Sequence, residues 1–174
     1  MSTGRDFRFH HFLIAGLIVL ADQVTKRIVE HKVPLNDGWI QVIPGFFQIT
    51  HVQNRGAAFS IFSSGTSELR TVLLVVFSTV AAIAVAYFLL RLGRTFSVVS
   101  IALSLVLGGA VGNLWDRIVH GRVTDFLHFY VGQYSWPDFN VADSAIVVGA
   151  ILLMIEIIWP RKQNAATRSG QQQS

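Results

Sequence analysis

Apolar residues gather along the chain in long segments, and polar residues separate these segments. Two of them, residues 71–90 and 95–114, contain no Asp, Glu, Lys or Arg. Because a helix needs about 20 apolar residues to cross the hydrocarbon core of a bilayer, each predicts a transmembrane helix. Two further segments, Phe12–Val29 and Val141–Trp159, are apolar apart from a few ionisable residues. The pattern predicts an all-α membrane protein, a bundle of four transmembrane helices.

Strand-like sequence fills residues 30–68, between the first two predicted helices. Two runs, Trp39–Ile43 and Phe46–Val52, are rich in the β-branched and aromatic residues that favour strands. Pro44 and Gly45 separate the runs and predict a turn. We therefore expect a small β-rich cradle on the outer side of the membrane, between helices 1 and 2.

Residues 115–140 predict a second outer connection, between the third and fourth helices. Alternation with period two in this connection marks four positions: Val123, Asp125, Leu127 and Phe129. One domain, residues 1–160, accommodates all these elements. Residues 161–174 are polar and rich in Gln, and they predict a disordered cytoplasmic tail.

The composition excludes an ordinary soluble globular protein. Of the 174 residues, 52% are hydrophobic and 14% are charged, whereas about 25% are charged in an average soluble domain. The chain contains no cysteine, which excludes disulfides, a thiolate nucleophile and Cys-ligated metal centres. Catalytic chemistry would therefore have to use Asp, Glu, His, Ser or Lys.

Lys and Arg residues predict the orientation in the membrane. With the N-terminus inside, the cytoplasmic segments hold seven of them in about 30 residues, and the outer segments hold seven spread over about 70 residues. Dense basic residues are typical of the cytoplasmic side, so we expect both termini in the cytoplasm. This distribution accounts for the net charge of +4, and no nucleic-acid partner is indicated.

Asp22 and Lys26 stand four residues apart on the first predicted helix. Acid before base at this spacing is favourable for an ion pair on one helix face. An ionisable side chain at membrane depth needs a partner or a task, since it costs at least about 2.5 kcal/mol there. We favour a structural ion pair over direct catalysis, and the pair can still shape a site.

The third predicted helix ends in small residues and then polar ones. Gly108 and Gly112 form a Gly-x-x-x-Gly spacing, which favours close helix packing. Asn113 follows, and Asp116 and Arg117 come one turn later. Arg117 either pairs with Asp116 or presents its guanidinium to a substrate carbonyl or a site carboxylate. The sequence alone leaves these two alternatives open.

Asp125 and Asp143 are the strongest candidates for catalysis. Asp125 lies in the second outer connection, and Asp143 lies in the first turn of the fourth helix, where Asn140 is a candidate N-cap. Each alone has a structural explanation, since the helix dipole favours Asp in a first turn. Together, at the outer end of one bundle, two carboxylates can share a water molecule and one proton, which provides an acid and a base for hydrolysis.

Other catalytic arrangements are not indicated. The chain has no Gly-x-Ser-x-Gly motif and no His-Glu-x-x-His motif. Its six histidines are scattered without the spacing of metal ligands. We therefore expect neither a metal nor another cofactor.

Four clusters of residues follow one another along the chain. They are Asp22-Gln23-Val24-Thr25-Lys26, Asn54-Arg55-Gly56-Ala57-Ala58-Phe59, residues 108–117 with 121–126, and Phe139-Asn140-Val141-Ala142-Asp143-Ser144. A single cluster would be weak evidence, but the four in this order are specific. Together they resemble one protein family, the lipoprotein signal peptidases or signal peptidase II, which are aspartic peptidases of the bacterial inner membrane. The resemblance covers roughly residues 12–160.

The resemblance implies a reaction and a set of roles. It implies cleavage of the signal peptide from a prolipoprotein, just before a Cys that carries diacylglycerol, at the periplasmic membrane surface. It implies that Asp125 and Asp143 form the catalytic dyad, and that the outer strands form a periplasmic cradle. It also implies sensitivity to globomycin-type inhibitors and contact with membrane lipid. The site-lining or supporting residues that it implies are Asn54, Gly56, Asn113, Arg117, Asn140, Asp22 and Lys26.

Two functions of other classes compete with the peptidase. A small proton-coupled transporter or channel subunit would use intramembrane carboxylates as a relay. The acids of this chain gather at the outer ends of the helices, however, and no inverted repeat is visible. A structural membrane subunit is the third option, and it does not require paired acids.

Overall fold

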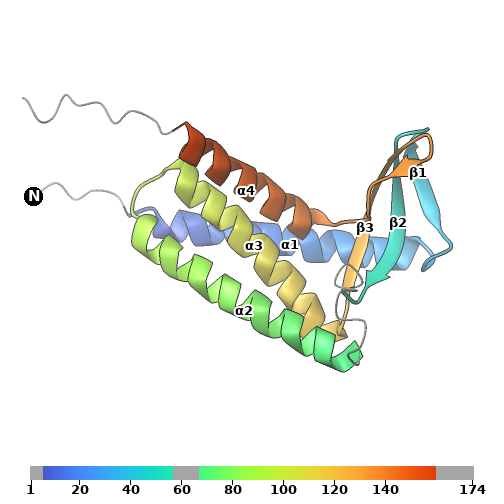
Figure 1. Ribbon diagram of the computed structural model, residues 1–174, viewed down its shortest axis with the longest axis horizontal. Coiled ribbons are helices and arrows are strands. Elements are labelled where there is room, and N and C mark those ends of the chain that lie inside the picture. Colours follow the sequence, from blue (N-terminus) through green and yellow to red (C-terminus); the bar gives the residue numbers. More distant parts are fainter. Residues whose placement is uncertain (1–5, 57–66, 160–174) are drawn as a thin grey trace, which may run out of the picture.

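The structure is a computed structural model that describes residues 6–56 and 67–159. Its helices pack side by side, and a small sheet lies at one end of the bundle (Figure 1). α1 and α3 run toward the sheet, whereas α2 and α4 run away from it (Figure 1). The four described helices are α1 (Arg8–Lys32), α2 (Ser67–Leu92), α3 (Val98–His120) and α4 (Val141–Ile158).

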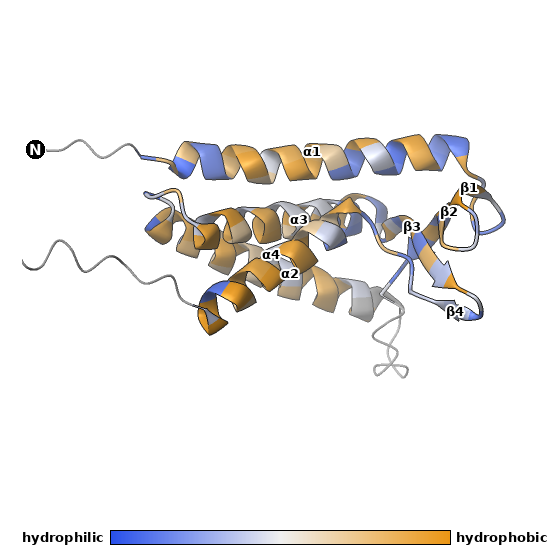
Figure 2. Ribbon diagram, turned by 90° about the horizontal axis from the view of Figure 1, so that it is seen from above, coloured by the Kyte–Doolittle hydropathy of each residue, from blue (hydrophilic) through white to orange (hydrophobic). Residues whose placement is uncertain are grey.

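Three of these helices are long and apolar enough to cross a membrane. They are Thr71–Leu92 of α2, Val98–His120 and Val141–Ile158. α1 is long enough at 25 residues, but its apolar stretch includes Asp22, Lys26 and Arg27. Figure 2 shows that hydrophobic residues dominate α2, α3 and α4, whereas hydrophilic residues recur along α1. The predicted membrane character is thus confirmed for three helices.

Glycines bring α3 close to its neighbours on two sides. A Cβ at Gly108 would lie 2.7 Å from the backbone oxygen of Ala15 in α1, and one at Gly109 would contact the backbone oxygen of Ala142 in α4. At either position, a side chain would collide with the backbone of the neighbouring helix. The glycine-rich segment therefore acts in helix packing, as the sequence predicted.

α3 extends further than the apolar pattern indicated. Ser97 caps its N-terminus, and its C-terminus is closed by Gly121, which adopts a left-handed conformation with φ 66° and donates to the Arg117 oxygen. The prediction that residues 115–140 form an outer connection was therefore wrong for its first six residues. The helix continues through Asp116 and Arg117 because their backbone groups still find partners within it, and the charged side chains mark the helix end instead of a loop.

The sheet draws strands from both connections. β1 (Trp39–Ile43) and β2 (Phe47–Asn54) form the predicted hairpin, and β3 (Val123–Val131) and β4 (Tyr134–Ser135) follow α3. The order is β1-β2-β3-β4, with antiparallel neighbours. The predicted strands between helices 1 and 2 are therefore present, and the sheet also includes the segment with period-two alternation in the second connection. In the β1–β2 hairpin alone, the outer edge of β2 would have unpaired backbone groups. β3 pairs with this edge and satisfies them.

A small apolar core fastens the sheet to the bundle. Val29 and Val33, at the end of α1, pack against Phe126 of β3, and all three are buried. In the register of the sheet, Val52 lies opposite Asp125 and Asn54 lies opposite Val123. Asn54 and Asp125 are therefore diagonal neighbours on one face, close enough for their side chains to touch.

Candidate active site

Asp125 and Asp143 meet where the sheet joins the helix bundle. Asp125 is the third residue of β3, and Asp143 is in the first turn of α4. Asp125 is only 3% exposed. The structure thus brings together the two acids that the sequence selected, although 17 residues separate them in the chain.

Two asparagines donate hydrogen bonds to Asp125. The Asn54 amide nitrogen donates to Oδ2 at 3.0 Å, and the Asn140 amide nitrogen donates to Oδ1 at 2.7 Å. The amide oxygens are occupied elsewhere, by the backbone N–H of Gly56 for Asn54 and by that of Asp143 for Asn140. A backbone N–H can only donate, so each amide must direct its NH₂ group toward Asp125.

A third asparagine serves Asp143 in the same way. The Asn113 amide nitrogen donates to Oδ1 of Asp143 at 2.7 Å. Its oxygen accepts from the Lys26 ammonium at 3.1 Å and from the Asn140 amide at 3.2 Å. Asn140 also caps α4, since its side chain accepts from the Asp143 N–H. Asn113 and Asn140 therefore connect the two carboxylates through neutral donors.

Burial dominates the electrostatics of Asp125. Removal of the carboxylate from water raises the pKa of Asp125 to about 6, and the negative charge of Asp143 contributes to this rise. The hydrogen bonds from Asn54 and Asn140 and the positive charge of Lys26 lower the pKa and limit the effect. Asp125 can therefore hold a proton near neutral pH, as a catalytic acid must.

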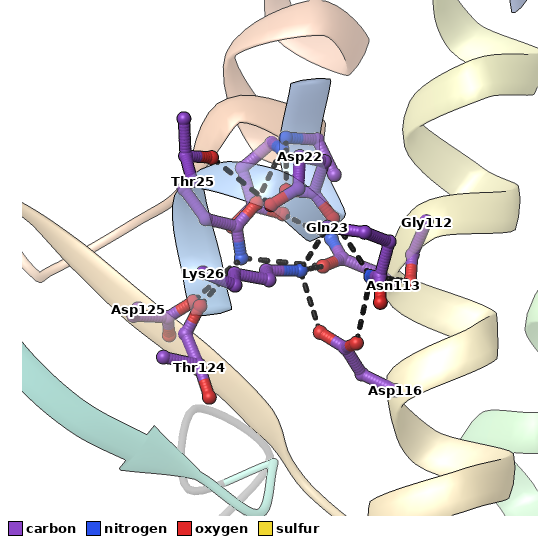
Figure 3. Close-up of polar contacts among 12 residues, drawn as sticks. Asp22, Gln23, Thr25, Lys26, Gly112, Asn113, Asp116, Thr124 and Asp125 are labelled. Atoms are coloured by element: carbon purple, nitrogen blue, oxygen red, sulfur yellow. Dashed lines mark hydrogen bonds and ion pairs between the residues drawn. The ribbon is translucent and has the colours of Figure 1, made fainter. Parts of the chain in front are cut away.

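Lys26 stands at the centre of a buried polar cluster between α1 and α3 (Figure 3). Its ammonium lies 2.7 Å from Oδ2 of Asp22, 2.6 Å from Oδ2 of Asp116 and 3.1 Å from Oδ1 of Asn113. Gln23 donates to the other carboxylate oxygen of Asp116 at 2.8 Å. The predicted ion pair between Asp22 and Lys26 is present, and it belongs to a larger network.

Asp116 belongs to this network and decides between the two alternatives that the sequence left open for Arg117. Its carboxylate pairs with Lys26 and not with Arg117. Asp116 comes four residues after Gly112 and three after Asn113 on α3, a spacing that puts it on the same helix face as each of them. The spacing was therefore a usable signal, but the helix that this face meets could not be read from it.

Arg117 and Gly56 lie at the edge of the site. The Arg117 guanidinium donates to the Asn113 backbone oxygen at 3.2 Å and interacts electrostatically with Asp143, Asp125 and Asp116. It forms no ion pair of 4.0 Å or less with these three acids. Gly56 has φ 84°, and a Cβ there would lie 2.5 Å from Leu74 of α2. Only glycine fits this turn, which places Asn54 beside Asp125.

Metal ligation has no support in residues 6–56 and 67–159, where no group of three or more His, Asp or Glu side chains is placed to hold an ion. The site is instead built from carboxylates, amides, one ammonium and one guanidinium. Such a set can bind a water molecule, polarise it and transfer protons.

Comparison with known proteins identifies the family. The sequence model described as Signal peptidase (SPase) II matches residues 14–159. The chain belongs to the signal peptidase II family. A lipoprotein signal peptidase of Solibacter usitatus is 48% identical over 160 residues, which are 92% of this chain and 97% of the relative. One of Desulforapulum autotrophicum is 40% identical over 84% of this chain and 90% of its own length.

A solved structure supports the same family assignment. It is described as a bacterial membrane enzyme and has 32% sequence identity and a TM-score of 0.79, with 92% of this chain and 99% of the other covered. At this identity and coverage, the chain shares the fold of that membrane enzyme over nearly its whole length. The protein is therefore a membrane peptidase of this family.

Proposed function

We propose that this protein is an aspartic endopeptidase that removes signal peptides from diacylglyceryl-modified prolipoproteins. It cleaves on the N-terminal side of the lipidated Cys, at the periplasmic surface of the bacterial inner membrane. The relatives are named lipoprotein signal peptidases, which supports the substrate class. The observation that carries the mechanism is the pair Asp125 and Asp143, linked through Asn113 and Asn140.

The reaction is an acid–base hydrolysis of one amide bond. A water molecule between the carboxylates attacks the carbonyl carbon, and ionised Asp143 accepts a proton from this water. Protonated Asp125 then protonates the leaving nitrogen, and the C–N bond breaks. At this stage Asp143 carries the proton and Asp125 is ionised, so proton exchange with water restores the starting state. Asp125 is assigned as the acid because its pKa is raised to about 6.

The surrounding residues hold this arrangement and receive the substrate. Asn54, Asn113 and Asn140 fix the carboxylates through directed amide donors. Arg117 has guanidinium N–H groups available to bind a substrate carbonyl, the second of the alternatives that the sequence left open. Gly56 shapes the turn after Asn54.

The membrane topology belongs to this proposal. All four helices span the inner membrane, and α1 is included because Asp22 and Lys26 form ion pairs inside the bundle. Both termini lie in the cytoplasm, and the sheet and dyad face the periplasm. The lipidated Cys then reaches the dyad from the membrane, and globomycin-type inhibitors occupy the same site. Residues 1–160 form one domain, and the tail predicted for residues 161–174 lies outside the described residues.

The test uses the purified protein and a synthetic prolipoprotein peptide that carries the diacylglyceryl group. Asp125→Asn and Asp143→Asn should each lower kcat by about 100-fold or more, since general acid–base catalysis contributes about that much. Asp138→Asn is the matched control. Asp138 binds His128 and Thr50 and forms no hydrogen bond with Asp125 or Asp143 in the described residues, so this variant should cleave normally.

Two outcomes would contradict the proposal. Folded Asp125→Asn and Asp143→Asn proteins that cleave as fast as the parent would exclude the dyad. Equal turnover of the same peptide without its diacylglyceryl group would exclude the proposed substrate class.

A further inference from the structure

We propose that Asp22 is a positioning residue for the hydrolysis: from α1 it holds the first turn of α4, and thereby the Asp143 carboxylate, in the reactive position. This inference rests on the proposed function for its catalytic consequence. Its structural part can be measured without any substrate.

The first turn of α4 is capped both by its own N-cap residue and by a side chain of α1. The first N–H groups of any α-helix lack partners within the helix. In α4 the Asn140 side chain accepts from the Asp143 N–H, which is the usual local cap. The Ala142 N–H instead donates to Oδ1 of Asp22 at 2.9 Å, across 120 residues of sequence. A carboxylate is favoured at this end of α4 by the helix dipole.

Asp22 is well placed to act as a rigid support. It is completely buried, and its second oxygen accepts from the Lys26 ammonium at 2.7 Å. α3 leaves room for it only because residue 112 is glycine. A Cβ there would lie 2.9 Å from Oδ2 of Asp22 and 3.4 Å from the Cβ of Ala142. α1, α3 and α4 therefore meet at this one carboxylate.

The position of Asp143 depends on this contact. Asp143 follows Ala142 directly, and its Oδ1 must reach the Asn113 amide at 2.7 Å. Without an acceptor for its N–H, Ala142 would leave a buried donor unsatisfied, and the first turn would shift or fray to find another. Because misplacement by about 1 Å can reduce a rate by about 100-fold, kcat should be sensitive to this contact.

Asp116 offers a matched comparison. It is also buried, and it also pairs with the Lys26 ammonium, at 2.6 Å. No hydrogen bond or ion pair joins it to α4 in the described part of the chain. Removal of either carboxylate takes one partner from Lys26, but only the removal of Asp22 takes the acceptor from Ala142.

The experiment compares Asp22→Ala, Asp22→Asn and Asp116→Ala in the full-length protein. The first readout is hydrogen–deuterium exchange of the peptide that covers residues 140–146. The second is kcat and KM with the diacylated peptide, corrected for the folded fraction. We expect similar losses of thermal stability in the two alanine variants, but faster exchange at α4 only in Asp22→Ala. Its kcat should fall about 10- to 100-fold with KM changed less than about threefold.

Asp22→Asn distinguishes the cap from the ion pair. Its amide oxygen can still accept from the Ala142 N–H. Its NH₂ group then faces the Lys26 ammonium, which loses this partner but keeps Asp116 and Asn113. Exchange at α4 should therefore remain slow, and kcat should recover at least about fivefold over Asp22→Ala. If Asp22→Ala does not fold, Gly112→Ala takes its place, because its Cβ pushes against both Asp22 and Ala142.

The proposal is overturned if exchange at α4 is unchanged in Asp22→Ala, or if Asp116→Ala reduces kcat as strongly. It is also overturned if Asp22→Asn is as defective as Asp22→Ala. A failure of the proposed function would look different. In that case none of the proteins would cleave the peptide, while the exchange difference between Asp22→Ala and Asp116→Ala would persist.

Discussion

At the scale of single residues, the site depends on which end of each amide points at a carboxylate. Asn54, Asn113 and Asn140 all direct NH₂ groups at Asp125 or Asp143. Each amide oxygen is held by a donor: the N–H of Gly56, the Lys26 ammonium or the N–H of Asp143. Reversal of any one amide would place a donor against a donor and an oxygen against a carboxylate. The ionised form of the dyad is therefore supported by groups that cannot easily turn away.

The pH dependence of cleavage tests this description at Asp125. Its protonated form supplies the catalytic proton, so kcat/KM should fall as the pH rises through the pKa of about 6. The Asn54 donor favours the ionised form and lowers this pKa. Asn54→Ala should therefore raise the pKa of Asp125 and move the alkaline limb of the kcat/KM profile to higher pH, by about one pH unit.

Thr50→Val is the control for this measurement. Thr50 also lies on β2 and donates a hydrogen bond, but its acceptor is Asp138 instead of Asp125. Its profile should coincide with that of the parent. A downward shift in Asn54→Ala, or no shift, would rule out Asp125 as the proton donor.

The candidate residues could be predicted from the sequence more completely than the contacts between them. Asp125 and Asp143 could be selected because paired acids are rare in so apolar a chain, and the spacing of Asp22 and Lys26 correctly predicted their ion pair. The pairing of Lys26 with Asp116 joins residues from different helices. No local pattern specifies which face of one helix meets which face of another, so this contact required the structure.

At the scale of elements, helix packing depends on glycines whose role differs with their surroundings. Gly109 of α3 faces α4, and a Cβ there would contact the Ala142 backbone oxygen and lie 2.7 Å from Ile146. A Cβ at Gly16 of α1 would have no atom within 4 Å. Close packing therefore requires glycine at position 109 but not at position 16.

Paired alanine substitutions measure this difference. Gly109→Ala should push α4 away from α3, and overpacking of this kind lowers stability by about 1–3 kcal/mol. Gly16→Ala should be neutral or stabilising by up to about 1 kcal/mol, because alanine has the higher helix propensity. Thermal unfolding in detergent provides the comparison. A loss of stability in Gly16→Ala equal to that in Gly109→Ala would show that packing at Gly109 is not the cause.

Helices and strands were predictable to different degrees. The charge-free segments identified α2 and α3, because a long apolar run has few alternatives to a membrane helix. The β1–β2 hairpin was also found, since its turn is local. The pairing of β2 with β3 was missed because the partners are about 70 residues apart, as in Asn54 with Val123. Such pairing is set by the packing of α1 and α3, which carry the strands to one end.

At the scale of the whole molecule, exposed apolar side chains cover the helices. Phe77 of α2 is 76% exposed and Ile157 of α4 is 78% exposed. In water such surfaces would be unfavourable, but in a bilayer they face lipid tails. The sheet and the dyad lie at one end of the bundle, whereas the beginning of α1 and the end of α4 lie at the other (Figure 1). A membrane around the helices would therefore separate the dyad from these two ends.

Single cysteines can determine which side of the membrane each end occupies, since the chain has no native Cys that would react. Ser135 lies exposed on β4, and Arg94 lies exposed between α2 and α3, at the opposite end of the bundle. With the dyad in the periplasm, Ser135→Cys should react with a membrane-impermeant maleimide in intact spheroplasts. Arg94→Cys should react only after the membrane is permeabilised. Both variants leave the site residues untouched, so retained peptide cleavage verifies the fold.

Labelling of Arg94→Cys alone in intact spheroplasts would invert the topology and place hydrolysis in the cytoplasm. Labelling of both would mean that the helices between them do not form a barrier, against the proposal that α2, α3 and α4 cross the bilayer.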